Sequence, residues 1–369
     1  MPTLRSIGKS CLAYAYTWSG ASHFIADTRS ASIPFIAGYH RVVEDFDGSK
    51  KSTIPSMLIS RAMLERHIEW LAKRFAFVSL DEIAHHLEAD RPFRRPVTAI
   101  TFDDGYSDVY YHAYPLLQRK GIPAAVFVVT SLIGTGRPQI FDRFYRMLQL
   151  LQKCGMPLAG TLSAALRDNG FDAGPLEPVR ASDEEPFKLM TIALNGFPQQ
   201  QIAAALASLE ARVPLPEGEL DDMAPMTWEM IETMHRTGMT IGSHTASHCV
   251  LPSETPENAY AELVSSKQTL ETRLRATVDH FAYPDGRFNP AVVQAVNSAG
   301  YRFAYGVCQF RDRNFPLLSI PRKILWERSC LNMLGRFSPS VMNCQVQWLF
   351  DRQDHCEHDH FARKNGTFA

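Results

Sequence analysis

Two short segments of the sequence hold side chains suited to binding a metal ion and hydrolysing an amide or ester. The segment TFDDGY contains the adjacent residues Asp103 and Asp104, and the segment GSHTASHCVL contains His244 and His248. Two neighbouring carboxylates repel each other unless a cation shares their charge. Two histidines four residues apart lie on one face of a helical turn, from which both rings can reach one metal. The two segments together predict a metal site.

The number of ligands indicates a catalytic site rather than a structural one. Asp104, His244 and His248 supply three protein ligands and leave a position open for water. A bound metal lowers the pKa of that water and polarises a carbonyl oxygen, and Asp103 can take the proton of the water. One carboxylate and two imidazoles suit Zn²⁺ best, although Co²⁺, Ni²⁺, Mn²⁺ and Fe²⁺ also bind such ligands. We therefore expect a hydrolase that depends on a divalent metal.

Each segment also has a structural interpretation when it is taken alone. Asp-Gly is a common turn pair, and a single strand-end histidine is more often a hydrogen-bonded core residue than a ligand. The metal interpretation depends on the position of both segments directly after predicted strands. The C-terminal ends of parallel strands are where α/β proteins build their sites.

Predicted strands and helices alternate through most of the chain. We expect strands at 33–40, 77–80, 96–105, 123–131, 239–244, 280–284 and 301–307. We expect helices at 61–74, where the apolar residues have helical spacing, and at 81–88, 228–238, 259–275 and 290–300. This alternation predicts an α/β fold with parallel strands and crossover helices, and it is compatible with both a barrel and an open sheet.

Three regions stand apart from this alternation. Residues 1–30 are expected to form an N-terminal helical segment, with a short export signal as the alternative. Residues 134–223 interrupt the main domain at 31–330 and are expected to be a mostly helical insertion. Residues 331–369 are expected to be a C-terminal tail, and its HCEHDH run is interpreted as a charged tail rather than a metal site.

Composition excludes several classes of protein. The chain has 369 residues, of which 45% are hydrophobic, so it can bury a large core. Its 38 basic and 39 acidic residues leave a net charge of −1, which gives no reason to expect binding to nucleic acid. No apolar run approaches the ~20 residues of a transmembrane span. Seven scattered cysteines without a CxxC pair favour a reducing compartment, and hence the cytoplasm over export.

The motifs TFDDGY, HTASH and FAYPDG, in this order, resemble the polysaccharide deacetylases with a NodB homology domain, carbohydrate esterase family 4. The resemblance extends from about Ile33 to Trp326, apart from the insertion. It implies a distorted (β/α) barrel of about seven parallel strands. It also implies Asp103 as the catalytic base, metal binding by the second aspartate and both histidines, and removal of N-acetyl groups from an N-acetylated glycan or glycan precursor. An O-acetyl esterase, a deformylase and a non-catalytic metal-containing sugar-binding protein are the alternatives.

Two features depart from the pattern of this family. Many members carry an arginine in the third motif, where this chain has Ala282, and we expect Arg322 of SIPRKIL to replace it unless it is a surface residue at a strand edge. Members also use a Leu-x-His motif for the general acid, but this chain has no histidine between His280 and His355. His40, at the end of the first predicted strand, is therefore the candidate acid; alternatively, it only hydrogen-bonds an inner residue.

Three further residues are expected to contact substrate if the resemblance holds: Tyr106, Tyr283 and Pro284. Tyr106 follows the aspartate pair and has packing as its alternative role. A backbone N–H near Tyr283 is expected to help hold the oxyanion that forms during hydrolysis.

Overall fold

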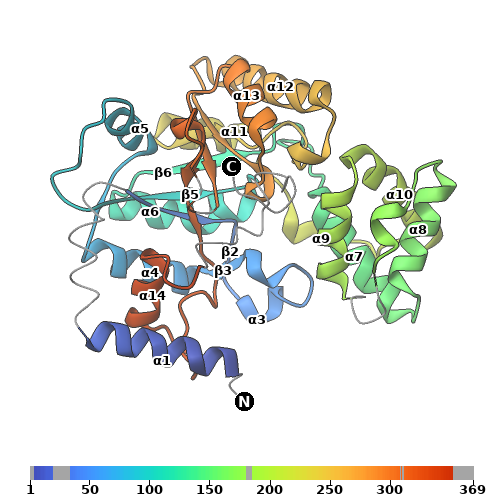
Figure 1. The fold of residues 1–369 in the computed structure, drawn as a ribbon, viewed down its shortest axis with the longest axis horizontal. Coiled ribbons are helices and arrows are strands. Elements are labelled where there is room, and N and C mark those ends of the chain that lie inside the picture. The colour runs from blue at the N-terminus through green and yellow to red at the C-terminus, as the bar shows by residue number, and fades with distance from the viewer. Residues whose placement is uncertain (1–3, 20–33, 180–184, 308, 310, 352–369) are drawn as a thin grey trace.

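A computed structural model describes residues 4–19, 34–179, 185–307, 309 and 311–351 of the chain (Figure 1). The run at 352–369, which contains the HCEHDH sequence, lies outside the described residues. So does the chain between 20 and 33, where the expected N-terminal segment ends and the first expected strand begins.

A sheet of parallel strands forms the centre of the molecule. Its strands pair in the order β10-β9-β8-β7-β6-β5-β1-β11, and outside this order β4 pairs with the first two residues of β5. The strands are β1 Phe35–Tyr39, β4 Ala76–Phe77, β5 Val97–Phe102, β6 Ala124–Val128, β7 Thr240–Ser243, β8 His280–Ala282, β9 Phe303–Gly306, β10 Ile320–Pro321 and β11 Lys323–Ile324. A second small sheet pairs β2 Arg41–Val43 with β3 Leu58–Ser60.

The large sheet closes because its two end strands follow each other in the chain. Only Arg322 separates β10, which pairs with β9, from β11, which pairs with β1. With 320–324 taken as one strand, the described residues form a ring of seven parallel strands. The prediction of a distorted barrel of about seven parallel strands is confirmed, and the open sheet is excluded.

Alternation along the strands separates the inside of the barrel from its outside. Ala99, Phe127, Ala282 and Tyr305 belong to one buried cluster, which we assign to the barrel interior. The intervening residues, such as Ile100, pack instead in the cluster that includes the surrounding helices. The same alternation, continued past the strand ends, decides which polar side chains face the mouth of the barrel.

Helices cover the outside of the barrel, as the crossover pattern predicts. They are α3 Phe46–Ser49, α4 Arg61–Ala72, α5 Leu80–Glu88, α6 Tyr114–Lys120, α11 Trp228–Arg236, α12 Pro256–Leu274 and α13 Pro290–Ser298. The expected strand at 77–80 is shorter than predicted, because Ser79 caps α5 by accepting the N–H of Glu82 at 3.1 Å. Ser79 and Leu80, which were expected to belong to the strand, therefore begin the helix instead.

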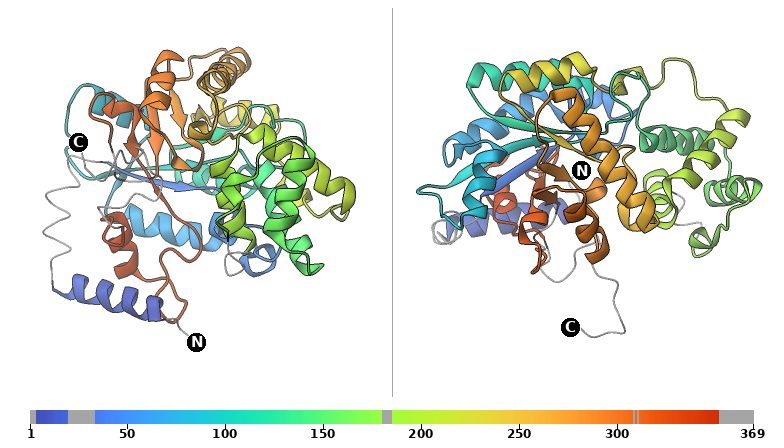
Figure 2. Two further views of the ribbon diagram at one scale, coloured as in Figure 1. Left: turned by 45° about the vertical axis from the view of Figure 1, so that its right-hand side comes forward. Right: turned by 90° about the horizontal axis from the view of Figure 1, so that it is seen from above.

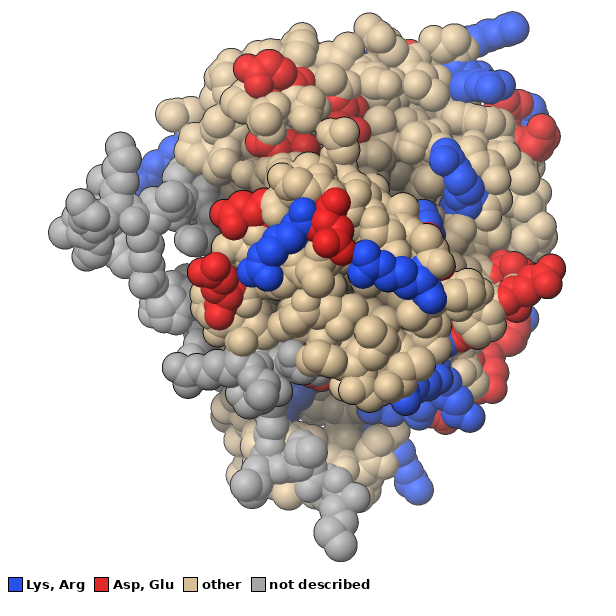
Figure 3. All heavy atoms as spheres, turned by 90° about the vertical axis from the view of Figure 1, so that its right-hand side faces the viewer, with Lys and Arg blue, Asp and Glu red and all other residues tan. Residues whose placement is uncertain are grey.

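The insertion forms a helical lobe beside the barrel (Figures 1 and 2). Its helices are α7 Ile140–Lys153, α8 Leu158–Asp168, α9 Pro186–Gly196 and α10 Gln199–Arg212. They share a hydrophobic cluster of their own, to which Tyr106 from the barrel also contributes. Figure 3, which faces this lobe, shows acidic and basic side chains interspersed, in line with the balanced charge of the sequence.

The two ends of the described chain pack together below the barrel in Figure 1. Helix α1, Leu4–Trp18, contacts α14, Pro339–Val346, through a small cluster that contains Ala13 and Val341. A folded helix therefore occupies part of the region that was expected to be a tail. Among the described helices, none is both long enough and apolar enough to cross a membrane.

Candidate active site

The mouth of the barrel gathers polar side chains from neighbouring strand ends. β1 and β5 pair with Tyr39 opposite Phe102, so His40 and Asp103 follow side by side. The N–H of Asp103 donates to the carbonyl of Tyr39 at 2.9 Å and extends this register by one residue. His244 follows directly after β7, where its N–H donates to the carbonyl of Val128 at 2.9 Å.

Asp104, His244 and His248 bring their ligand atoms together, as the sequence analysis predicted. Oδ1 of Asp104 lies 3.4 Å from Nε2 of His244 and 3.2 Å from Nε2 of His248. One ligand atom from each of the three residues lies within 4.8 Å of the others. The carboxylate is turned to this position by backbone in the left-handed region, with φ at 71° for Asp104 and also for Gly105.

The expectation that a helical turn carries the two histidines is wrong. They lie on a loop in which Thr245 and His248 both have left-handed backbone, with φ of 66° and 63°. Oγ1 of Thr245 accepts the N–H of His248 at 2.9 Å, while Glu262 of α12 accepts the two backbone N–H groups between them at 2.9 and 2.8 Å. These side-chain bonds replace helical hydrogen bonds, and they bring the imidazole centroids to 4.9 Å.

The hydrogen bond on the far side of His244 fixes its tautomer. Its Nδ1 lies 2.8 Å from the carbonyl oxygen of Ala282, which can only accept a hydrogen bond. The ring proton therefore resides on Nδ1. Nε2, which faces Asp104, is then the nitrogen left to bind a metal, the arrangement that metal-binding histidines use.

The surroundings of Asp104 fit a bound cation. Both carboxylate oxygens are buried, and neither has a hydrogen-bond partner among the described residues. Burial raises the pKa of Asp104, but the adjacent rings of His244 and His248 outweigh this and hold it well below its usual value. An ionised buried carboxylate beside two imidazole nitrogens is a donor set that suits a divalent transition metal.

Arg322 lies inside the barrel against Asp103. Its Nη1 and Nη2 donate to the two carboxylate oxygens at 2.7 and 2.8 Å, and Nη1 also donates to Oγ1 of Thr101 at 3.2 Å. The guanidinium is fully buried, with its Cζ 4.9 Å from the ring centre of Phe127. Burial raises the pKa of Asp103, but the charge of Arg322 leads the effects that hold it below its usual value. The surface alternative for Arg322 is thereby excluded.

His40 lies close enough to the aspartate pair for its charge to lower the pKa of both carboxyls. Its Nδ1 is buried and has no hydrogen-bond partner among the described residues. Nδ1 of His40 therefore gives no support to the alternative, in which His40 only hydrogen-bonds an inner residue.

The three residues expected to contact substrate are buried in the structure. Both phenols are buried, and each already has a protein partner: Tyr106 donates to Asp142 at 2.6 Å, and Tyr283 donates to the carbonyl of Leu318 at 2.8 Å. Pro284 is also buried. The backbone N–H of Tyr283 itself donates to the carbonyl of Tyr305 at 3.1 Å. The oxyanion role expected for a backbone N–H near this residue stays a prediction.

The sequence analysis missed the start of α7, which borders the candidate metal ligands. Phe141 places its ring centre 4.8 Å from that of His248, and Asp142 accepts the hydrogen bond of Tyr106. Gln139, just before the helix, donates to the backbone carbonyl of Asp104 at 3.1 Å. No motif marks these residues, because their place at the site depends on how the insertion docks.

The structure is thus a closed parallel barrel with two carboxylates and two histidines at its mouth. A family model described as polysaccharide deacetylase matches residues 90–157 and 199–304, on both sides of a gap within the insertion. Over these two segments the chain is similar to the polysaccharide deacetylase family.

Two curated relatives agree with this family. Bacillus subtilis YxkH, whose name places it among polysaccharide deacetylases, is 20% identical over 282 residues, or 76% of this chain and 66% of that protein. The poly-beta-1,6-N-acetyl-D-glucosamine N-deacetylase of Staphylococcus aureus is 32% identical over 106 residues, or 26% of this chain and 36% of that enzyme. The chain thus matches just under two thirds of the first relative and about a third of the second.

Solved structures support the fold. The Streptococcus pyogenes deacetylase PplD, solved with acetate, superposes with a TM-score of 0.52 at 17% identity, over 82% of this chain and 95% of that chain. IcaB from Ammonifex degensii gives a TM-score of 0.51 at 16% identity, over 86% of this chain and 97% of that chain. At this identity the likeness establishes the shared barrel and nothing further.

Proposed function

We propose that this protein is a metal-dependent hydrolase that removes N-acetyl groups from amino sugars of a polysaccharide or glycan precursor. The observation that carries the proposal is the convergence of Asp104, His244 and His248 on one point, beside an ionised Asp103. These residues supply the ligands and the base that amide hydrolysis requires.

Each side chain has one task in the proposed reaction. Asp104, His244 and His248 hold the metal, which when bound activates water and polarises the acetyl carbonyl. Asp103 accepts the proton of the attacking water, and Arg322 orients it and keeps it ionised before attack. His40 donates a proton to the departing amine of the sugar.

The names of the relatives support an N-acetylated glycan as the class of substrate. One of them is named for deacetylation of poly-beta-1,6-N-acetyl-D-glucosamine, which makes an N-acetylglucosamine polymer the first substrate to try. The chain is close to neutral, so we expect hydrogen bonds and stacking to select the sugar rather than charge. Among metals we propose Zn²⁺, which suits one carboxylate and two imidazoles.

Acetate release tests this function directly. The purified protein is incubated with β-1,6-linked N-acetylglucosamine oligomers, with chito-oligosaccharides and with acetylated xylan, before and after treatment with a chelator. We expect release from an amino-sugar substrate that the chelator abolishes and added Zn²⁺ restores. Release that survives complete metal removal would overturn the metal mechanism.

Variants separate the alternatives within the same assay. Asp103→Asn removes the base but none of the three ligands, so it should abolish turnover while metal binding persists. Release from acetylated xylan alone would instead identify an O-acetyl esterase. Metal and sugar binding without release from any substrate, formylated sugars included, would identify a non-catalytic binding protein.

A further inference from the structure

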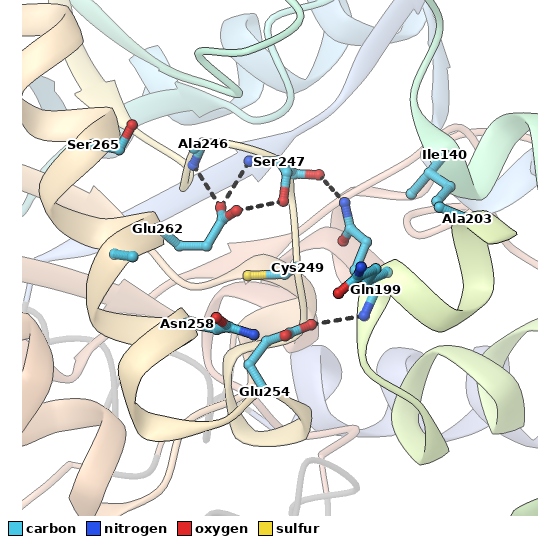
Figure 4. Close-up of a pocket in the computed structure, with 12 residues that line it drawn as sticks. Ile140, Gln199, Ala203, Ala246, Ser247, Cys249, Glu254, Asn258, Glu262 and Ser265 are labelled. Atoms are coloured by element: carbon cyan, nitrogen blue, oxygen red, sulfur yellow. Dashed lines mark hydrogen bonds between the residues drawn. The ribbon is translucent and has the colours of Figure 1, made fainter. Parts of the chain in front are cut away.

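Two glutamines of the insertion each donate a hydrogen bond to a loop that carries metal ligands. Nε2 of Gln139 lies 3.1 Å from the backbone carbonyl oxygen of Asp104. Nε2 of Gln199 lies 2.5 Å from the carbonyl oxygen of Ser247, the residue before His248 (Figure 4). A carbonyl only accepts hydrogen bonds, so the amide nitrogen must be the atom that faces each loop.

The side chain of Gln139 does not cap its own helix, although the residue stands at the N-cap position. It occupies the N-cap of α7, where Ser, Thr, Asp or Asn usually caps the helix, yet its side chain makes no capping bond. The side chain is buried, and its Oε1 has no partner among the described residues. The hydrogen bond to the carbonyl of Asp104 is therefore the polar contact that the Gln139 side chain makes among the described residues.

Gln199 makes hydrogen bonds both to the loop that carries His244 and His248 and to Glu254, a few residues after that loop. It is the first residue of α10, and its backbone N–H donates to the carboxylate of Glu254 at 2.7 Å while its side chain reaches Ser247. Glu262 of α12 holds the same loop from the other side through Ser247 Oγ at 2.8 Å. A cavity of about 470 Å³ lies between these elements (Figure 4).

The loops need such support because their backbone is strained. Asp104 has φ at 71°, Thr245 at 66° and His248 at 63°, a region that L-residues other than glycine seldom occupy. Such conformations persist only where the surrounding structure enforces them. Two of the three strained residues are the metal ligands themselves, so relaxation of either loop would separate the ligand atoms.

We propose that Gln139 and Gln199 are positioning residues through which the insertion holds both ligand loops in their metal-binding geometry. The metal affinity of the barrel then depends on the insertion, although every ligand belongs to the barrel. This inference rests on the proposed metal site.

The test compares metal binding by the full-length protein and three variants. Gln139→Met and Gln199→Met keep the approximate size of each side chain but cannot donate the hydrogen bond. Gln200→Met is the matched control, because this exposed neighbour lines the same cavity and has no hydrogen bond to the loop among the described residues. Each protein is stripped of metal, titrated with Zn²⁺ by calorimetry, and loaded with Co²⁺ for its visible absorption spectrum.

We expect each positioning variant to bind Zn²⁺ about 10- to 100-fold more weakly and to change the Co²⁺ spectrum, while the control matches the wild type. Unchanged Zn²⁺ affinity and spectrum in both folded variants would refute the inference. Should Gln139→Met not fold, the half-buried Gln199→Met decides it alone. A wild-type protein that binds neither ion would instead refute the metal site of the proposed function.

Discussion

At the scale of single residues, the contact between Asp103 and Arg322 sets the charge of the proposed base. Two parallel hydrogen bonds between buried side chains fix the orientation of the carboxylate and favour its ionised form. The sequence analysis named this arginine as the replacement for the one that the third motif lacks. Its partner follows from barrel closure: β11 pairs with β1, which pairs with β5, so Arg322 inside the barrel comes within reach of Asp103 at the end of β5.

Replacing Arg322 by Ala should lower kcat and shift the pH profile. Removal of the guanidinium raises the pKa of Asp103 toward and above its usual value, so the acid limb of the kcat/KM profile moves to higher pH. The unpaired buried carboxylate should also destabilise the fold by roughly 3–5 kcal/mol. Steady-state kinetics across pH and urea unfolding measure both effects. Arg302→Ala, a surface change, is the control, and near-normal turnover by Arg322→Ala would contradict the role.

Replacing His40 by Ala tests the proposed acid. Loss of the proton donor should lower kcat by about 10²- to 10⁴-fold, with the basic limb of the profile lost. Metal affinity should remain close to that of the wild type, because His40 is not among the proposed ligands. His85→Ala on exposed α5 is the control. A variant whose pH–rate profile is superimposable on the wild type would remove His40 from the mechanism.

At the scale of elements, the site could be predicted because its residues follow directly after strands, not because the local turns could be recognised. Aspartates after one strand and histidines after another must approach each other once the strands lie parallel in one sheet. The turn around His244 and His248 was predicted wrongly, because spacing alone cannot reveal that Glu262, far along the chain, binds the loop backbone. Left-handed residues in that loop carry no sequence signal either, since none of them is glycine.

The contacts made by α7 were beyond prediction for a related reason. Helical periodicity shows which face of α7 is apolar, but it does not show which barrel residues that face will meet. Asp142, in the first turn, is buried and accepts the hydroxyl of Tyr106. In the sequence it looks like an ordinary acidic residue at a helix start. Its burial raises its pKa to about 7, despite the opposing charge of Arg41.

Asp142→Asn should therefore change how stability depends on pH. The carboxyl titrates near 3.8 when unfolded and near 7 when folded, so the folded state binds the proton more tightly. Stability from this group is fully present below about pH 4 and is lost as pH rises toward 7. Asparagine still accepts the hydrogen bond of Tyr106 but cannot ionise. The advantage of the variant should grow with pH, on the order of 4 kcal/mol across this window.

Urea unfolding at several pH values between 4.5 and 7.5 measures this difference. Asp168→Asn, which removes an exposed carboxylate at the far end of α8, serves as the control for a general charge effect. Parallel stability curves for wild type and Asp142→Asn would show that the buried carboxyl does not titrate in this range.

At the scale of the whole molecule, the same residues that close the barrel also build its mouth. The segment at 320–324 completes the ring of strands and delivers Arg322 to Asp103. Beneath this pair, Phe127 contacts the guanidinium and packs its ring centre 5.5 Å from that of Tyr305. A change in the packing of the barrel interior should therefore affect both stability and catalysis.

Gly242 offers the sharpest test of this coupling. A Cβ added there would lie 2.5 and 2.6 Å from two atoms of the Phe127 ring and 3.0 Å from the backbone oxygen of His280. The ring can move away only by pushing on Tyr305 and Arg322, which pack against it. Gly242→Ala should thus destabilise the protein by about 1–3 kcal/mol. It should also lower kcat, since a displaced ring disturbs the arginine that orients Asp103.

The matched control is Gly8→Ala, at which an added Cβ meets no atom within 4 Å. In helix α1 this change should be neutral or stabilise by up to about 1 kcal/mol, because alanine favours a helix more than glycine does. Thermal unfolding and acetate release are measured for both variants. If Gly242→Ala lost stability but kept full kcat, the barrel interior would tolerate repacking without moving Arg322. The closure of the barrel and the geometry of its mouth would then be independent properties of this fold.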